Sequence, residues 1–165
     1  MMSSRWPGWM TTLLVAGLFC QSLACSSNEP RYPEDHARFL RIDAAVERLR
    51  TAYVEQNLAE IRDVMLPFDR LDQMSEDIEQ DFETFDSIEL DLSVDRIMLD
   101  SETIDVFVRW QGLWRRGATD PGIRERGHGM LRWVGVQSIM LKNVDGDLPF
   151  GMATRIHQSG PRTIP

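Results

Sequence analysis

The stretch from Asp86 to Trp114, DSIELDLSVDRIMLDSETIDVFVRWQGLW, decides the fold that this sequence predicts. In residues 88–94, and again in 103–110, apolar and polar residues alternate with a period of two. This is the pattern of antiparallel strands with one face on a core and the other in water. The inward faces would carry Ile88, Leu90, Leu92 and Val94 in the first run, and Ile104, Val106, Val108 and Trp110 in the second.

Upstream of these strands the apolar residues take a helical spacing. From residue 36 to residue 65 they recur every three or four positions, and the phase of the stripe slips by one position near Asn57. Asn57 and Glu60 have the spacing of a capping box, so we predict a long helix, a break near Asn57 and a shorter helix halted by Pro67. The stripe of the long helix consists of Phe39, Ile42, Val46, Leu49 and Tyr53. The same spacing predicts a third helix from Leu71 to Phe85.

Two more strands are predicted downstream, from about Arg126 to Val134 and from about Gln137 to Val144, and glycines within these runs indicate bends. Helices followed by antiparallel strands make an α+β fold, here with about four strands in a strongly curved sheet. Residues 153–165 have no periodicity and are expected to be an unstructured tail.

The N-terminus has the composition of an export signal. Arg5 precedes an apolar run from Met10 to Phe19, which is shorter than the ~20 residues that a membrane-spanning helix needs. Ser22-Leu23-Ala24-Cys25 resembles a bacterial lipobox, in which the cysteine is acylated and becomes the new N-terminus, although Ser22 stands where leucine is usual. The alternative is an ordinary signal-peptidase cut after Ala24, which would leave a soluble secreted or periplasmic protein.

Cysteine usage favours the lipobox. Cys20 lies in the segment that would be removed, so the mature chain would contain Cys25 alone, and a lone thiol in an oxidising compartment is a liability unless it is modified. We therefore predict a lipoprotein signal peptide over residues 1–24, a lipid anchor (palmitate) at Cys25, and a flexible tether over residues 25–35. Ser26, rather than Asp, after the cysteine indicates the outer membrane, with the domain facing the periplasm.

Charge and motif content exclude several classes of function. The net charge is −8, and it becomes −9 without residues 1–24, whose only charged side chain is Arg5. Because an acidic chain repels phosphate backbones, no nucleic-acid partner is expected. The three histidines, His36, His128 and His157, have no metal-ligand spacing, and no phosphate loop, dinucleotide fingerprint or nucleophile elbow is present. We expect no metal and no cofactor.

The order of the predicted elements, together with three motifs, resembles the nuclear transport factor 2-like superfamily, especially its secreted and lipid-anchored bacterial members. The motifs are Asp81-Phe-Glu-Thr-Phe-Asp-Ser-Ile88, Trp110 to Trp114, and Val144-Asp-Gly-Asp-Leu-Pro-Phe-Gly151. We assign residues 36–152 to a domain of this kind. The resemblance implies a cone in which a sheet wraps around the long helix, with a pocket between them. Its members are binding or dimerisation modules, or small-molecule isomerases, dehydratases and cyclases, so the fold alone does not decide the function.

The residues that would line such a pocket are Tyr53, Trp110, Trp114, Trp133 and His128. Tyr53 lies on the stripe of the long helix, and two interpretations of it stay open. Its hydroxyl could polarise a carbonyl beside a proton acceptor, or it could be a core tyrosine whose hydroxyl reaches a backbone group. Trp110 and Trp114 flank Gly112, and they either form a slot for a flat apolar ligand or pack as core.

Three functions remain open at this point. The first is a lipid-anchored envelope protein whose domain binds a partner or a small apolar ligand without catalysis. It is favoured by the export signal, the lone cysteine of the mature chain and the missing catalytic set. The acids of the first two strands should point away from the helix-covered side, which argues against a buried carboxylate base there; they are Glu89, Asp91, Asp95 and Asp105. The second is an isomerase- or dehydratase-like enzyme that uses Tyr53 with a carboxylate or His128. The third is a structural or assembly protein that forms a homodimer through exposed Phe107 and Leu113.

Overall fold

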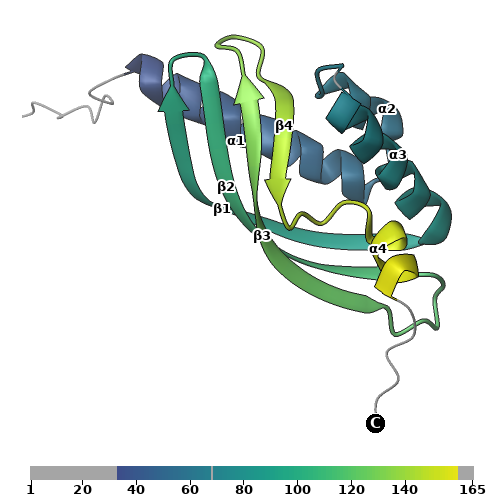
Figure 1. Cartoon of the computed structure of the whole chain (residues 1–165). Coiled ribbons are helices and arrows are strands. Elements are labelled where there is room, and N and C mark those ends of the chain that lie inside the picture. The colour runs from purple at the N-terminus through teal and green to yellow at the C-terminus, as the bar shows by residue number, and fades with distance from the viewer. Residues whose placement is uncertain (1–32, 68, 160–165) are drawn as a thin grey trace, which may run out of the picture. The chain divides into compact units, whose positions relative to one another are not determined.

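The computed structural model describes residues 33–67 and 69–159, and of these the residues from Glu34 onward belong to one compact unit (Figure 1). The predicted signal peptide, Cys25 and most of the tether lie outside the described residues. The elements in chain order are α1 (Pro33–Val54), α2 (Leu58–Asp63), α3 (Asp69–Thr84), β1 (Ser87–Asp100), β2 (Thr103–Arg115), β3 (Ile123–Val134), β4 (Met140–Gly146) and α4 (Met152–Ser159). The predicted α+β order is confirmed. None of the described helices combines the length and apolarity of a bilayer span.

The break that the sequence predicts near Asn57 is confirmed. Gln56 has the left-handed φ of 56°, and Asn57 is the N-cap of α2, its side-chain oxygen accepting a hydrogen bond from the Glu60 backbone N–H at 3.2 Å. The reciprocal half of the capping box does not form, because the Glu60 carboxylate pairs with Arg48 of α1. This pairing links the two helices across the break.

Both ends of the predicted domain need correction. Helix α1 begins at Pro33, so the prediction of a flexible tether is wrong for residues 33–35; the fixed φ of proline suits the first helical position. At the other end, the prediction of an unstructured tail is wrong for residues 153–159, which belong to α4. This helix contacts α3, and Met152 and Ala153 are buried. A helix of eight residues is too short to show a clear period in the sequence, and packing rather than propensity stabilises it.

The four strands form one antiparallel sheet in the order β1-β2-β3-β4. The predicted alternation of β1 holds from Ile88 to Val94, where Val94 pairs with Val108. The next pair is Arg96 with Phe107, which leaves Asp95 as the extra residue of a bulge. Because of the bulge, the later apolar residues of β1 return to the inner face, the face that α1 covers. The sheet continues beyond the predicted limits at two places, with β3 beginning at Ile123 and β4 ending at Gly146. The prediction of a fourth strand is wrong for residues 137–139, because the chain bends after Gly135, which has a φ of 105°, and β4 begins only at Met140.

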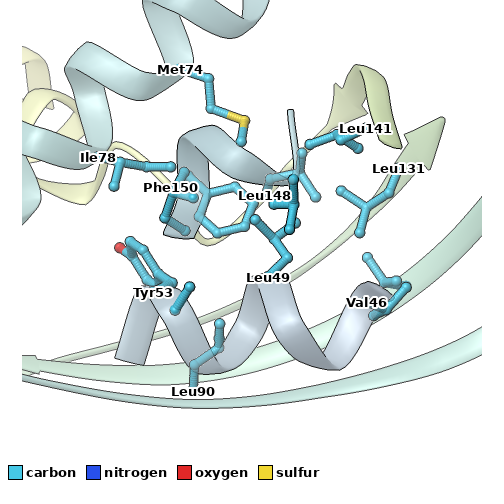
Figure 2. Packing of buried hydrophobic residues seen from close by; sticks show 14 of the residues in the cluster. Val46, Leu49, Tyr53, Met74, Ile78, Leu90, Leu131, Leu141, Leu148 and Phe150 are labelled. Atoms are coloured by element: carbon cyan, nitrogen blue, oxygen red, sulfur yellow. The ribbon is translucent and has the colours of Figure 1, made fainter. Parts of the chain in front are cut away.

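The core lies between α1, α3 and the inner face of the sheet. In Figure 2 the side chains of Val46, Leu49 and Tyr53 project from α1 toward Met74 and Ile78 of α3. The largest side chains with almost no exposure are Trp110, Trp114, Trp133, Tyr53 and Phe85. Burying one such side chain is worth roughly 1.5–3 kcal/mol. The interior of the domain is therefore a packed aromatic core.

Candidate functional site

The side chain of Asp81, on α3, is a fully buried carboxylate at the centre of a polar network. Its Oδ2 accepts hydrogen bonds from the Tyr53 hydroxyl and the Gly151 backbone N–H, both at 2.7 Å. Its Oδ1 accepts one from the Ala153 backbone N–H, also at 2.7 Å. The two N–H groups are at the N-terminal end of α4. Asp81 therefore caps this helix from 70 residues away, as an N-cap side chain would do locally.

The hydroxyl of Tyr53 is saturated by the same network. The indole Nε1–H of Trp114 donates to it at 2.9 Å, and the carbonyl oxygen of Pro149 lies 3.1 Å from it. The hydroxyl has one proton, and its shorter contact, to the carboxylate, is the stronger of the two. The ring of Tyr53 meets that of Phe150 edge to face, with 5.0 Å between centroids. Tyr53 is thus a core tyrosine, as the second interpretation expects, but the stronger partner of its hydroxyl is the carboxylate of Asp81 and not a backbone group.

Burial sets the electrostatics of this pair. It raises the pKa of Asp81, and the hydrogen bonds from Ala153, Tyr53 and Gly151 counteract part of that shift. Burial, with the neighbouring charge of Asp81, raises the pKa of Tyr53 well above its ordinary value. A carboxylate of raised pKa beside a phenol has the composition of a general-base pair. Neither side chain is exposed, however, so the pair fastens α4 to the core and no substrate reaches it in this conformation.

The structure places four of the five predicted pocket residues in the core and the fifth outside it; of the four, Trp133 pairs with Ile104, far along the sheet from Trp110 and Trp114. Tyr53, Trp110, Trp114 and Trp133 are all in the core. The rings of Trp110 and Trp114 pack edge to face at 6.0 Å and 89°, so they fill space instead of forming a slot. The place of the expected pocket beside Tyr53 is taken by aromatic side chains, namely Trp114, Phe82 and Phe150. His128 is exposed on the opposite face of the sheet.

That opposite, outer face carries a hollow of ≈ 680 Å³. Cross-strand neighbours surround it, in two rows across β1, β2 and β3. We call this hollow the outer groove, and its polar residues are Asp91, Ser93, Arg109, Gln111, Arg126 and His128. A second hollow of ≈ 660 Å³ adjoins it, sharing Asp91, Gln111 and Arg126 and extending to Arg124. The outer face is thus the hollowed polar surface of the sheet.

Two arginines of β3 give the outer face its available positive charge: Arg126 lines the outer groove and Arg124 lines the second hollow. Arg109 pairs with Asp95 at 3.4 Å, whereas Arg124 and Arg126 are exposed and have no hydrogen bond or ion pair within residues 33–67 and 69–159. A guanidinium group matches the geometry of a carboxylate or a phosphate, and the His128 ring adds another hydrogen-bonding group. The groove can therefore bind an anionic group. In the same described ranges, no cluster of three or more His, Cys, Asp or Glu side chains is placed to hold a metal ion.

The predicted apolar outer surface is wrong. Leu113 is buried, and Gly122 lies so close that an added Cβ there would be 2.5 Å from the Leu113 Cδ1. Phe107 is half-buried beneath the guanidinium of Arg96, which lies 4.3 Å from the ring centroid. The outward direction of the strand acids is confirmed by Asp105, which accepts two hydrogen bonds from Arg132, at 2.6 and 2.8 Å.

Asp81 is the residue that sequence reasoning missed. It appears in the sequence only as the first residue of a motif, yet the helical spacing contains a signal. Asp81 follows Ile78 by three positions and precedes Phe85 by four, so it lies on the apolar stripe of the third helix. A single carboxylate on an apolar stripe requires a buried partner. The partners, in residues 151–153, are in the segment that was predicted to close the domain and begin its tail.

Comparison with known proteins identifies the fold. No protein-family model and no curated protein matches the chain significantly. Among solved structures, a nuclear transport factor 2-like superfamily protein from Salmonella enterica matches with a TM-score of 0.59 at 11% identity, over 70% of this chain and 93% of that one. The Kfla4162 protein of Kribbella flavida also scores 0.59 at 11% identity, over 74% and 99%.

A third structure, a proposed dehydratase of the same family from Streptomyces avermitilis, scores 0.59 at 9% identity, over 68% of this chain and 99% of that one. At such identities the likeness concerns the fold alone. The element order, the antiparallel sheet and these matches agree. The described domain has the nuclear transport factor 2-like fold.

Proposed function

We propose that this protein is a lipid-anchored protein of the bacterial cell envelope whose domain binds a partner without catalysis. One observation carries the non-catalytic part. The Tyr53 hydroxyl and the Asp81 carboxylate satisfy one another and α4. By contrast, the exposed side chains of Arg126, in the outer groove, and Arg124, in the adjoining hollow, have no hydrogen bond or ion pair within residues 33–67 and 69–159. Binding therefore belongs to the outer face, and the ligand carries a carboxylate or phosphate group. The small apolar ligand and the apolar homodimer surface predicted from the sequence are less well supported.

The groove can be tested on protein purified from its own membranes. Mass spectrometry would identify what remains bound, and the paired variant Arg124→Glu with Arg126→Glu should lose that molecule, because a carboxylate would repel its anionic group. The matched control is Arg70→Glu with Lys142→Glu, which reverses two exposed cations outside the groove. If the ligand stays bound to the Arg124→Glu/Arg126→Glu variant, or is lost equally from this variant and from the control variant, binding through the groove is contradicted.

The anchor rests on the signal-like residues 1–24 and on Cys25 as the lone cysteine of the mature chain. We place the anchor in the outer membrane, facing the periplasm. Mass analysis of the mature protein should show acyl chains on an N-terminal Cys25, and Cys25→Ser should remove that mass. A mature chain that starts at Met1 would show that the signal is retained. A cut after Ala24 that leaves Cys25 unmodified would show that the protein is secreted without an anchor. Either result would contradict the proposed lipid anchor.

An enzymatic alternative has one observation in its favour. The 2.7 Å contact between Tyr53 and a carboxylate of raised pKa is the kind of pair that an isomerase or dehydratase would use. It requires α4 to move so that a substrate can reach the pair. Hydrogen exchange at Gly151 and Ala153 tests this requirement: slow exchange at both amides would show that α4 remains closed.

A further inference from the structure

We infer that the end of the domain where α1 begins lies against the surface of the membrane that holds the anchor. The choice of a lipid bilayer as the occupant of this surface rests on the proposed acylation of Cys25. The surface itself is a feature of the folded domain, on a different part of the molecule from the outer groove.

The exposed large hydrophobic residues are confined to this end. Within the described part of the chain, the large apolar side chains that face solvent are Phe39 (41% exposed), Leu40 (57%), Met98 (50%), Leu99 (37%) and Val136 (45%). We call these five residues the apolar rim. Single exposed hydrophobic residues are common on soluble proteins, but a group gathered in one place marks an interaction site.

Two hydrogen bonds place the first turns of α1 beside both turns at this end of the sheet, so the members of the rim share one end of the domain although they come from three parts of the sequence. At this end Met98, which pairs with Asp105, lies on the outer face of β1, and Leu99, which pairs with Ile104, lies on the inner face. Arg38 of α1 donates to the Ser101 carbonyl in the β1–β2 turn at 2.7 Å. Arg41, one helical turn later, donates to the Val136 carbonyl in the β3–β4 connection at 3.0 Å. Phe39 and Leu40 lie between these two arginines, and Met98 and Leu99 end β1 just before the turn. Figure 1 shows both turns at the same end of the sheet, beside the first turns of α1.

The position of the rim along the chain favours a bilayer as its occupant. Pro33, where α1 begins, follows Cys25 by eight positions, so the two are at most about 29 Å apart even with an extended chain. Helix α1 has 22 residues and is about 33 Å long, so the end of the domain where it begins is the end nearest to Cys25 along the chain. The apolar rim is thus at the end that an acylated Cys25 would bring to the lipid.

The charges around the rim limit how deeply it enters the bilayer. Arg38 and Arg41 are half-buried beside it, and their guanidinium groups suit the phosphates of lipid headgroups. Asp100 and Glu102 are exposed at the β1–β2 turn and would resist transfer into hydrocarbon. The contact is therefore interfacial: Leu40, Met98 and Val136 reach the boundary between headgroups and acyl chains while the turn stays at the level of the headgroups.

The experiment uses the acylated protein with a single introduced cysteine. Acylation blocks Cys25 and processing removes Cys20, so Val136→Cys or Thr119→Cys would provide the one free thiol for an environment-sensitive dye. Thr119, in the β2–β3 loop at the other end of the sheet, is exposed and is the matched control. In vesicles of phosphatidylethanolamine and phosphatidylglycerol with a lipid-borne quencher, the dye at 136 should shift to the blue and lose intensity, and the dye at 119 should do neither.

Substitutions within the rim sharpen the test. Leu40→Glu with Met98→Glu should abolish quenching at 136, whereas Ala118→Glu with Thr119→Glu, which adds the same charge at the far end, should leave it unchanged. Equal quenching at 136 and 119 would overturn the inference, because the domain would then move freely on its tether. A blue shift of the dye at 136 that occurs without vesicles and grows with protein concentration would also overturn the inference. It would show that a second copy of the protein, and not a bilayer, covers the apolar rim.

Mass measurement of the same sample reports the anchor separately, so the two proposals can fail independently. If Cys25 is not acylated, the proposed anchoring is wrong, and the vesicle test is repeated by adding vesicles to the soluble protein with Cys25→Ser. Quenching at 136 in that experiment would still support the rim as a membrane-binding surface. Its absence there would overturn the inference.

Discussion

Two carboxylates on opposite faces of the sheet show how burial reverses the consequences of similar geometry. Asp81 accepts its hydrogen bonds at 2.7 Å in the core, and Asp105 accepts two from Arg132 at 2.6 and 2.8 Å on the outer face. Burial raises the pKa of Asp81, whereas the hydrogen bonds from Arg132 lower the pKa of Asp105. The inner carboxylate therefore holds the structure together at an electrostatic cost, whereas the outer carboxylate is stabilised in its charged form by a cation beside it.

The largest effect expected from this comparison follows removal of the inner carboxylate. Asp81→Ala leaves the Tyr53 hydroxyl and the N–H groups of Gly151 and Ala153 without their acceptor. Each buried donor that loses its partner costs about 1–3 kcal/mol, so the free energy of unfolding should fall by about 3 kcal/mol or more. Urea denaturation measures it, with Asp105→Ala as the control on the outer face. Equal losses for the two variants would remove the distinction between the faces.

A smaller loss is expected when only the phenolic hydroxyl is removed. Tyr53→Phe keeps the ring packing but leaves the Trp114 N–H without its acceptor, which should cost about 1–2 kcal/mol in the free energy of unfolding. A double-mutant cycle with Asp81→Asn should show coupling, because the two side chains share a hydrogen bond. Strict additivity would mean that Tyr53 and Asp81 act independently.

The two carboxylates should also give opposite pH dependences, each with a slope of at most about 1.4 kcal/mol per pH unit. A raised folded pKa means that the contribution of Asp81 is fully present below about pH 4 and is lost as the pH rises through that pKa. A lowered folded pKa means that the contribution of Asp105 is present above about pH 4 and is lost as the pH falls through that pKa. Denaturation of the wild type, Asp81→Asn and Asp105→Asn across pH would isolate each slope, and slopes of the same sign would break the comparison.

The smallest effect belongs to the outer pair itself. The Asp105 side chain is 23% exposed, and solvent screens its attraction to Arg132. Asp105→Asn at neutral pH should therefore lower the free energy of unfolding by less than about 1 kcal/mol, and added salt should reduce the difference. A larger decrease in the free energy of unfolding that does not respond to salt would show that the Asp105–Arg132 pair behaves as a buried interaction and not as a solvent-screened one.

The sequence predicted those elements whose physics is local. The alternation from Ile88 onward specified the first strands, and Asn57 with Glu60 marked the helix break. The bulge in β1 was not predicted, although it leaves a local signal: after Val94 the apolar residues change phase, because Ile97 and Leu99 no longer alternate with the residues before them. In each case the signal lies within a few neighbouring residues.

The features that escaped prediction depend on residues far apart in the chain. Helix α4 is capped by a side chain on α3, so its own sequence contains no N-cap signal for it. Leu113 alternates like an exposed strand residue, and only the loop that returns to Gly122 covers it. The expected pocket beside Tyr53 required a gap between the helix and the sheet, and the volume of the indole rings closes that gap. Arg124 and Arg126 share a face because they are two positions apart on β3, but only the register of the strands brings Arg126 beside Gln111 and His128 beside Arg109.

The capping of α4 by Asp81 has a consequence for the order in which the chain folds. Proteins are made from the N-terminus, and the amides that satisfy this carboxylate belong to residues 151 and 153, near the end of synthesis. A nascent chain that stops at Phe150 holds a carboxylate without these donors inside an otherwise apolar core. We expect ribosome-bound chains of that length to be cut rapidly by protease and complete chains to resist. The domain would then become stably folded only after its last helix has been synthesised.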